Sequence, residues 1–426
     1  MRKILVREKV KNVGFVATRL KGTDGVSLET RKWVQVMGEM GLRSFYFAGQ
    51  LDTLPKRSML EPLADFQHPK VVDIYERCFN NQSRDRKLTL KIHQVKENLK
   101  EALYNFINNF DIHLLVVENA LAIPLNLPLG MAVAELIAET RIRTIGHHHD
   151  FFWERKRFLV NAAWDYVNMA FPPVLPALHH AVINSSSANQ LALRTGACST
   201  IIPNVMDYDE QPEEPDDYAR ELRKDLGLEV DDIFILQPTR VVQRKGIEHA
   251  TELADRLGEK AKLVISHGSG DEGHSYLKRI TGYARTMDVS LILAANRVGP
   301  RRKKTEDGKK IYKLSDFYQS ADLVTFPSSF EGFGNAFLEA LYYKKPVLVN
   351  NYSVYSTDIK PKGFRTIEID DFITDETVEY TRKVLSDEKL RKQMVDHNYD
   401  MARRYYSYSI LRDKLNVILD NAFGHN

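Results

Sequence analysis

Short apolar runs rich in β-branched residues alternate with longer amphipathic stretches along most of the chain. This alternation is typical of β-α units around parallel sheets, so the sequence predicts an α/β fold. Two sets of five strands predict two Rossmann-like, doubly wound domains. The expected strands are residues 13–18, 44–48, 113–117, 143–148 and 181–185, and then 233–238, 262–267, 290–294, 323–326 and 346–349.

An acidic segment with two prolines, residues 207–217, separates the two sets of strands. Such a composition is typical of an exposed connector. We therefore expect an N-terminal domain over residues 1–207, a linker over 208–218 and a second domain over 219–404. Apolar residues at helical spacing between 405 and 423 predict a final amphipathic helix in segment 405–426. Either domain could receive this helix, and a return to the first domain is one alternative.

Composition excludes several classes of protein. The chain has 426 residues, 43% of them hydrophobic, and 60 basic against 57 acidic residues give a net charge of +3. This near balance creates no overall attraction to nucleic acid or an anionic membrane, and we expect neither as a partner. Two cysteines suit a reducing compartment. The N-terminus lacks a signal-peptide core, and charges and prolines interrupt the most apolar stretch, residues 112–137, so we expect a cytoplasmic protein without stable membrane insertion.

The segment 326–350 carries the strongest candidate chemistry, F-P-S-S-F-E-G-F-G-N-A-F-L-E-A-L-Y-Y-K-K-P-V-L-V-N. A glycine-containing turn between a predicted strand and a helix brings backbone amides to an anion, which predicts a phosphate site. Glu331 in the turn and Glu339 in the helix are eight residues apart, so they could stand up to roughly 12 Å apart on either side of that site. This spacing fits the hydroxyls of a sugar and of a ribose. A helix N-terminus that favours acidic residues would produce the same pattern without any ligand.

A second segment, Q-P-T-R-V-V-Q-R-K-G-I-E-H-A at 237–250, follows the first strand of the second half. Ligands of open α/β sheets bind outside the carboxyl ends of strands, where Arg240 and Lys245 could offset the charge of a departing diphosphate. A solvated basic turn is the alternative. The glycine loop H-G-S-G-D-E-G at 267–273, with Gly268, follows another strand and would form a third side of the site.

The two segments together resemble the donor site of retaining glycosyltransferases of family 4, which have the GT-B fold with a cleft between two Rossmann-like domains. The order of motifs agrees over most of the chain. The resemblance implies that Glu331 binds the transferred sugar near its 3-hydroxyl, Glu339 the ribose, and Arg240 with Lys245 the diphosphate. The donor-binding residues it implies besides these are Gly22, Gly25, Gly268, Gly332, Phe333, Gly334 and Asn335.

The N-terminal glycine loop is T-R-L-K-G-T-D-G-V-S-L-E, residues 18–29, with a helix expected from Ser27. Family members often carry two adjacent glycines here, whereas this chain has Asp24-Gly25. Asp24 could therefore contact the acceptor, or the segment could be a simple turn with a helix cap.

A histidine cluster, I-G-H-H-H-D-F-F-W-E-R, occupies residues 145–155. On an extended strand His147 and His149 face one way and His148 the other. A metal site would need further ligands besides these two histidines, so we expect no metal here. The resemblance implies that His149 is catalytic and that its backbone carbonyl faces the reacting carbon. The expected acceptor-side neighbours are Asn119, Asp150 and Arg155.

The resemblance implies transfer of a hexose, with retention, from a nucleoside-diphosphate sugar such as GDP-mannose or UDP-glucose to a hydroxyl of a small soluble acceptor. The segments 22–29 and 149–155 are similar to a subset of the family that uses GDP-mannose and glucosylglycerate in compatible-solute synthesis. We expect no required cofactor, because Arg240, Lys245 and helix N-termini would take the place of a metal. Sucrose-phosphate-synthase-like transfer, a sugar phosphorylase and a silent sugar-nucleotide sensor are the alternatives, and homo-oligomerisation stays open.

Overall fold

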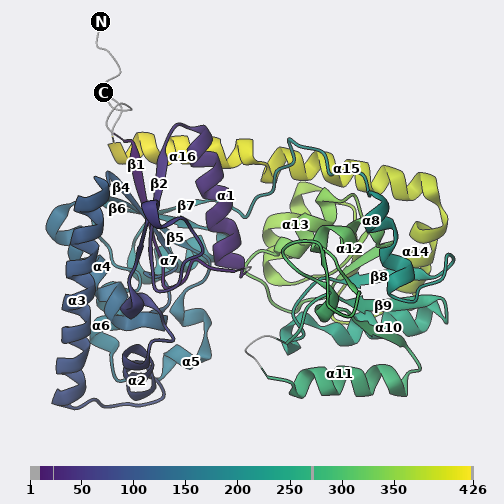
Figure 1. The fold of residues 1–426 in the computed structure, drawn as a ribbon, viewed down its shortest axis with the longest axis horizontal. Helices are drawn as coiled ribbons and strands as arrows, with labels where there is room; N and C mark the ends of the chain where they lie inside the picture. The colour runs from purple at the N-terminus through teal and green to yellow at the C-terminus, as the bar shows by residue number, and fades with distance from the viewer. Residues whose placement is uncertain (1–9, 23, 270–272, 424–426) are drawn as a thin grey trace, which may run out of the picture. The chain divides into compact units, whose positions relative to one another are not determined.

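The computed structural model describes residues 10–22, 24–269 and 273–423. The chain divides into two compact units, unit 1 with Met1–Val205 and Tyr408–Asn426, and unit 2 with Met206–Ser407 (Figure 1). Each unit is built on its own parallel sheet, one of seven strands and one of six. The predicted α/β class with two doubly wound sheets is confirmed.

Unit 1 has the strand order β3-β2-β1-β4-β5-β6-β7, with all neighbours parallel. The strands are β1 (Asn12–Val16), β2 (Arg43–Ala48), β3 (Ser58–Leu60), β4 (Leu114–Glu118), β5 (Arg143–His148), β6 (Leu178–Val182) and β7 (Ser199–Ile201). The helices are α1 (Gly25–Glu39), α2 (Pro69–Cys78), α3 (Arg86–Phe110), α4 (Leu127–Thr140), α5 (Lys156–Leu159), α6 (Trp164–Ala170), α7 (Ser185–Thr195) and α16 (Tyr408–Phe423).

The central strand β4 shows why this sheet is buried on both faces. All five of its residues, Leu-Leu-Val-Val-Glu, are buried, as expected of a strand in the middle of a parallel sheet. Leu115 and Val117 pack against α3 and α4, whereas Leu114 and Val116 pack against α1 and α16. Glu118 is the last residue of this apolar run, so the strand carries one carboxylate at its carboxyl end.

The last helix belongs to unit 1. In α16, Leu411, Leu415 and Ile418 are fully buried and join the core cluster that contains Trp33 of α1. Arg412 adds an ion pair with Glu39 at the end of α1. The apolar spacing therefore predicted the buried face of this helix, which begins at Tyr408.

Unit 2 has the strand order β10-β9-β8-β13-β14-β15, again parallel throughout. The strands are β8 (Ile233–Gln237), β9 (Ala261–Ile265), β10 (Ser290–Leu293), β13 (Leu323–Phe326), β14 (Val347–Asn350) and β15 (Ile367–Ile369), with a separate hairpin of β11 (Lys303–Lys304) and β12 (Lys310–Ile311). The helices are α8 (Asp217–Arg220), α9 (Leu222–Asp225), α10 (Ile247–Leu257), α11 (Ser275–Thr286), α12 (Leu314–Ser320), α13 (Asn335–Tyr342), α14 (Asp375–Ser386) and α15 (Glu388–Tyr406).

One strand was predicted three residues too late in the sequence. The segment 181–185 was expected to be a strand, but β6 is Leu178–Val182. Asn184 instead caps α7, because its side-chain oxygen accepts a hydrogen bond from the Ser187 amide at 2.7 Å. Three edge strands of three residues each, β3, β7 and β15, are too short to produce a recognisable apolar run and were not predicted.

The acidic connector is exposed for most of its length, but Tyr208 corrects the expectation for one position. Its ring is fully buried, its hydroxyl donates to Leu338 O at 2.7 Å, and its carbonyl accepts from the Tyr399 hydroxyl at 2.9 Å. This residue therefore anchors the start of unit 2. Among the described residues, no helix combines the length and the apolar character needed to cross a bilayer.

Candidate functional site

The carboxyl ends of β8 and β13 in unit 2 bring together a buried lysine and a buried glutamate. A single 3₁₀ turn after β8, Gln243–Lys245, ends at Gly246 in the left-handed conformation (φ 58°). A side chain at Gly246 would collide with Pro327 O, so the turn packs directly against the segment that leads to Glu331. Lys245 Nζ forms an ion pair with Glu331 Oε1.

Two cations surround the Glu331 carboxylate. Arg244 Nη1 lies 3.1 Å from Glu331 Oε2, whereas Lys245 contacts the other oxygen, Oε1. Burial acts to raise the pKa of Glu331, but the charges of Lys245 and Arg244 outweigh it and hold that pKa below its ordinary value. Burial lowers the pKa of Lys245, and the nearby Arg240 adds to this effect. The site therefore holds one carboxylate among three cationic side chains, an excess of positive charge suited to an anionic ligand.

The turn after Glu331 has the predicted strand-turn-helix form. β13 ends at Phe326, Gly334 has a φ of 122°, and α13 begins at Asn335. A side chain at Gly334 would lie 3.0 Å from the Phe326 ring and the Tyr352 hydroxyl, so the close packing here requires glycine. Phe333 is buried, and its carbonyl accepts from Tyr352 at 2.6 Å. Gly332 lies between Glu331 and this fixed segment.

The second glutamate, Glu339, lies in the middle of α13 and is half-buried. Tyr318 of α12 donates its hydroxyl to Glu339 Oε2 at 2.7 Å, and its ring stacks on Tyr343 with centroids 5.2 Å apart. The Tyr318 ring is almost fully buried, so it holds this carboxylate in one orientation. The sequence analysis missed Tyr318, which stands 21 residues before its partner.

The glycine loop after β9 is only partly described, because residues 270–272 of 267–273 lie outside the described residues. Gly268 is exposed, and its carbonyl accepts from the Val241 amide at 3.1 Å, which joins this loop to the one carrying Arg240. Burial lowers the pKa of His267, and the charges of Arg240 and Lys245 lower it further. His267 thus lies near both cations, and a histidine two residues after a strand was the signal that could have identified it.

In unit 1 the N-terminal glycine loop is a helix cap. The Asp24 carboxylate accepts from the Val26 and Ser27 amides, both at 3.1 Å, and from the Ser27 hydroxyl at 2.7 Å. Gly25 is the first residue of α1, two residues earlier than expected. Gly22 has a φ of 83°, and its amide donates to Asp52 at 3.1 Å. Asp24 therefore has a structural task in this unit, which favours the simpler of the two interpretations.

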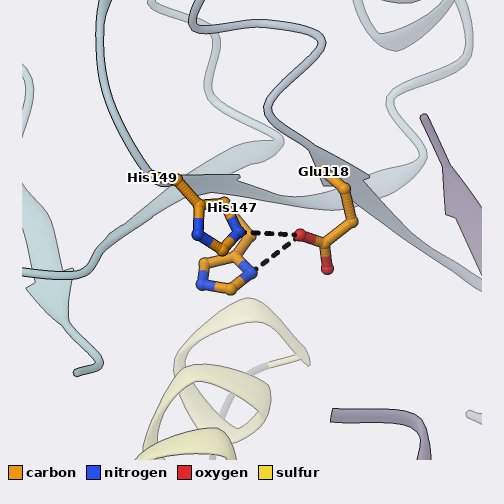
Figure 2. A group of neighbouring side chains, drawn as sticks. All are labelled: Glu118, His147 and His149. Atoms are coloured by element: carbon orange, nitrogen blue, oxygen red, sulfur yellow. Dashed lines mark hydrogen bonds and ion pairs between the residues drawn. The ribbon is translucent and has the colours of Figure 1, made fainter. Parts of the chain in front are cut away.

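The histidine cluster gathers around a carboxylate that the sequence analysis did not identify as functional. Glu118 ends β4 beside His147 of β5, its register neighbour, and His149 follows one residue after β5 ends. His147 Nδ1 lies 2.9 Å and His149 Nε2 lies 3.4 Å from the same oxygen, Glu118 Oε2 (Figure 2). His147 and His149 therefore share one face, as predicted.

Charge and burial oppose each other in this cluster. Burial acts to raise the pKa of Glu118, but the two imidazoles outweigh it and hold that pKa at about 2. Burial lowers the pKa of His147 despite the attraction of Glu118. For His149, burial also acts to lower the pKa, but the hydrogen bond to Glu118 outweighs it and the pKa is raised. Glu118 is thus an ionised carboxylate that makes His149 the more basic of the two rings.

A second network continues from the same strand ends. Asn119, with a φ of 59°, accepts from the His149 amide at 3.0 Å and donates to Asp150 Oδ1 at 2.9 Å. Arg155 forms an ion pair with the other oxygen of Asp150. Burial and the charge of Asp150 raise the pKa of the neighbouring Glu154 to about 7. The structure therefore brings the predicted residues His149, Asn119, Asp150 and Arg155 together and adds Glu154.

His148 points to the opposite face of the sheet. Its Nε2 lies 2.9 Å from His180 Nδ1 of β6, and both rings are buried. Burial lowers the pKa of both histidines, for His180 to about 4. This pair belongs to the core of unit 1.

The chain is similar in sequence to known glycosyltransferases. A sequence model of the family described as glycosyl transferases group 1 matches residues 303–401. The chain is similar to mannosylglucosylglycerate synthase of Petrotoga mobilis, with 31% identity over 379 residues, 84% of this chain and 86% of that protein. It is also 31% identical to mannosylglucosylglycerate synthase of Thermotoga maritima, over 92% of this chain and 96% of that protein.

The fold agrees with solved structures as well. The crystal structure of a glycosyltransferase from Rickettsia africae aligns with 98% of this chain at a TM-score of 0.70 and 12% identity, which shows the shared GT-B fold. Identity of 31% with curated relatives over most of the chain shows the family. The chain therefore belongs to the group 1 glycosyltransferases, the retaining glycosyltransferase family 4, and is a hexosyltransferase that uses a nucleotide-sugar donor.

Proposed function

We propose that the enzyme transfers mannose from GDP-mannose to glucosylglycerate with retention of the anomeric configuration. The observation that carries the proposal is the buried Lys245–Glu331 pair with Arg244 and Arg240 around it. The names and the 31% identity of the two relatives above support this donor and this acceptor. UDP-glucose as donor is the rival that the experiment below separates.

The donor side of the proposal is unit 2. Glu331 accepts hydrogen bonds from hydroxyls of the sugar, while Arg240 and Lys245 bind the diphosphate and stabilise its growing charge as the sugar leaves. Backbone amides at Gly334, Asn335 and the start of α13 add the positive end of a helix. Glu339, held by Tyr318, accepts from the ribose hydroxyls.

The acceptor side of the proposal is unit 1. Glucosylglycerate carries hydroxyls and one carboxylate, and the network at the end of β5 offers partners for both. Asp150 and Asn119 suit hydroxyls, and the Arg155 guanidinium, 42% exposed, suits a carboxylate. The His149 ring contacts Glu118, and the family resemblance implies that the backbone carbonyl of His149 faces the sugar.

The proposed step balances without an enzymic nucleophile. The bond between the anomeric carbon and the phosphate oxygen breaks, and a bond from the acceptor hydroxyl forms on the same face. The acceptor proton passes to the departing diphosphate, whose charge Lys245 and Arg240 offset. No metal is needed on the diphosphate in this scheme, so we expect transfer to continue in the presence of a chelator.

Transfer assays with purified protein test the proposal. With GDP-mannose and glucosylglycerate, Glu331→Gln is expected to lower kcat/KM by roughly 100- to 1,000-fold, because it removes a charged acceptor from the reacting sugar. Glu139→Gln is the matched control, since Glu139 is a surface carboxylate bonded to Lys100 and Tyr104. Product from UDP-glucose and a sugar phosphate, but not from GDP-mannose, would overturn the substrate assignment. Full activity of Glu331→Gln would overturn the site.

A further inference from the structure

The Glu118 carboxylate has an unusual environment for a buried charge. Its side chain is completely buried, and two imidazole nitrogens approach the same oxygen, Oε2. The other oxygen, Oε1, is buried without a hydrogen-bond partner among the residues that the structure describes. A buried carboxylate oxygen without a partner carries a considerable desolvation cost, so such a group calls for an explanation.

The three side chains have the spacing of metal ligands. One ligand atom from each of Glu118, His147 and His149 lies within 4.8 Å of the other two, and the contacts with the glutamate are 2.9 and 3.4 Å. With metal bonds of 2.0–2.2 Å, neighbouring ligands in a tetrahedral site stand about 3.3 Å apart. The observed separations therefore need only small side-chain movements to close around an ion.

The backbone and neighbouring rings hold these ligands in place. Glu118 and His147 are register partners in the middle of a seven-stranded sheet, and His149 is fixed by the hydrogen bond from its amide to Asn119. Trp33 stacks on the His147 ring with centroids 4.1 Å apart and an interplanar angle of 25°. Figure 2 shows the two imidazoles turned towards the carboxylate from one side. Ligands on strands with packed rings form a preorganised site.

We propose that Glu118, His147 and His149 form a binding site for one divalent transition-metal ion. Two imidazoles and one carboxylate are the three-ligand set of open zinc sites, and the set leaves a further position for water or a substrate oxygen. Bidentate coordination by Glu118 would also supply the partner that Oε1 lacks. The sequence indicated two same-face histidines without a further ligand, and the β4–β5 register supplies it.

The proposed ion has a different task from the cations of unit 2. It ties the end of β4 to the segment after β5, where hydrogen bonds already hold Asn119 and Asp150 without an ion. It uses only the ring of His149 and leaves the backbone carbonyl of that residue uncoordinated. The site is therefore independent of the proposed donor chemistry, in which Arg240 and Lys245 serve the diphosphate.

Cobalt titration of the metal-stripped, full-length protein tests this site, with the visible absorption of Co²⁺ as the readout. We expect one Co²⁺ per chain with an absorption typical of histidine ligation, displaced by one equivalent of Zn²⁺. Glu118→Gln and His149→Asn are each expected to weaken binding by roughly 100-fold, about the loss of one of three ligands. His179→Asn is the matched control, because His179 lies on the neighbouring strand and pairs with Thr200 at 2.9 Å.

Thermal stability supplies a second readout that needs no spectroscopic ion. Zn²⁺ is expected to raise the melting temperature of the wild type and of His179→Asn, but not that of the two ligand variants. Far-UV circular dichroism establishes that each variant is folded, and His149→Asn carries the test if Glu118→Gln does not fold. No saturable cobalt spectrum in the wild type, or equal affinity in the ligand variants, would overturn the proposal. Neither result depends on donor, acceptor or transfer.

Discussion

The two sheets of the molecule end in sites of opposite charge. At the carboxyl edge of unit 2, one carboxylate, Glu331, lies among the cations Lys245, Arg244 and Arg240. At the corresponding edge of unit 1, the described side chains that contact the Glu118 carboxylate are the imidazoles of His147 and His149. The same architecture therefore gathers an excess of positive charge in one unit and, around Glu118, a carboxylate suited to neutral or cationic groups in the other. The excess charge at the strand ends decides which ligand a site favours. The effect of that charge can be tested in each unit separately.

The largest effect is expected from breaking the ion pair of unit 2. Lys245→Met leaves the buried Glu331 with the half-exposed Arg244 as its remaining ion-pair partner, which should lower the free energy of unfolding by about 3 kcal/mol. Adding Glu331→Gln removes the uncompensated charge, so the double variant should regain most of that stability while transfer stays lost. Hydrogen exchange of the β13 and β14 amides measures the change within unit 2.

The matched control for this variant lies in the same unit. Lys344 also pairs with a carboxylate, Asp396 at 3.2 Å, but both side chains are 37% exposed. Lys344→Met is therefore expected to cost no more than about 1 kcal/mol. If the double variant were no more stable than Lys245→Met, the interpretation of Glu331 as a carboxylate that depends on its cations would be wrong.

The next largest effect is a loss of stability of unit 1 at acidic pH. Burial lowers the pKa of His180 from its ordinary 6.5 to about 4, and that of its partner His148 as well. Between those two pH values the unfolded chain binds a proton that the folded unit resists, so stability is complete above pH 6.5 and is lost as the pH falls towards 4. The loss from His180 alone should be about 3 kcal/mol, at 1.36 kcal/mol for each pKa unit.

Hydrogen exchange of the β5 and β6 amides, measured across this pH range, checks the loss. The β13 and β14 amides of unit 2 serve as the internal reference, since Leu323 and Leu348 of these strands belong to a cluster of apolar side chains. His180→Asn should reduce the pH dependence of β5 and β6 without changing that of unit 2. An unchanged slope in the variant would show that the pair does not make unit 1 sensitive to acid.

The sequence predicted the site of unit 2 more completely than that of unit 1. Lys245, Glu331 and Glu339 lie in short segments next to predicted strands, so local pattern and family resemblance sufficed to name them as candidates. Glu118 is 29 residues from His147, and only the pairing of β4 with β5 makes them neighbours. Tyr318 likewise reaches Glu339 through helix packing. Contacts that depend on register or on packing between helices leave no signal in local periodicity.

The smallest effect is expected at Glu339. Tyr318→Phe removes the hydroxyl that donates to Glu339 Oε2 at 2.7 Å but keeps the ring that stacks on Tyr343. Loss of one hydrogen bond to a charged group should weaken nucleotide binding by roughly 10-fold, since Glu339 is no longer held in position. Isothermal titration with GDP measures the affinity directly, without the acceptor.

Tyr104→Phe is the control that makes this prediction specific to the nucleotide side. Tyr104 also donates its hydroxyl to a glutamate, Glu139 at 2.8 Å, but on the surface of unit 1. Its loss should leave GDP affinity and the melting temperature nearly unchanged, because exposed polar contacts contribute little. Equal affinity for GDP in Tyr318→Phe and the wild type would mean that Glu339 finds its orientation without Tyr318. A loss confined to GDP binding would show that buried packing in unit 2, as well as charge, prepares its edge for a nucleotide.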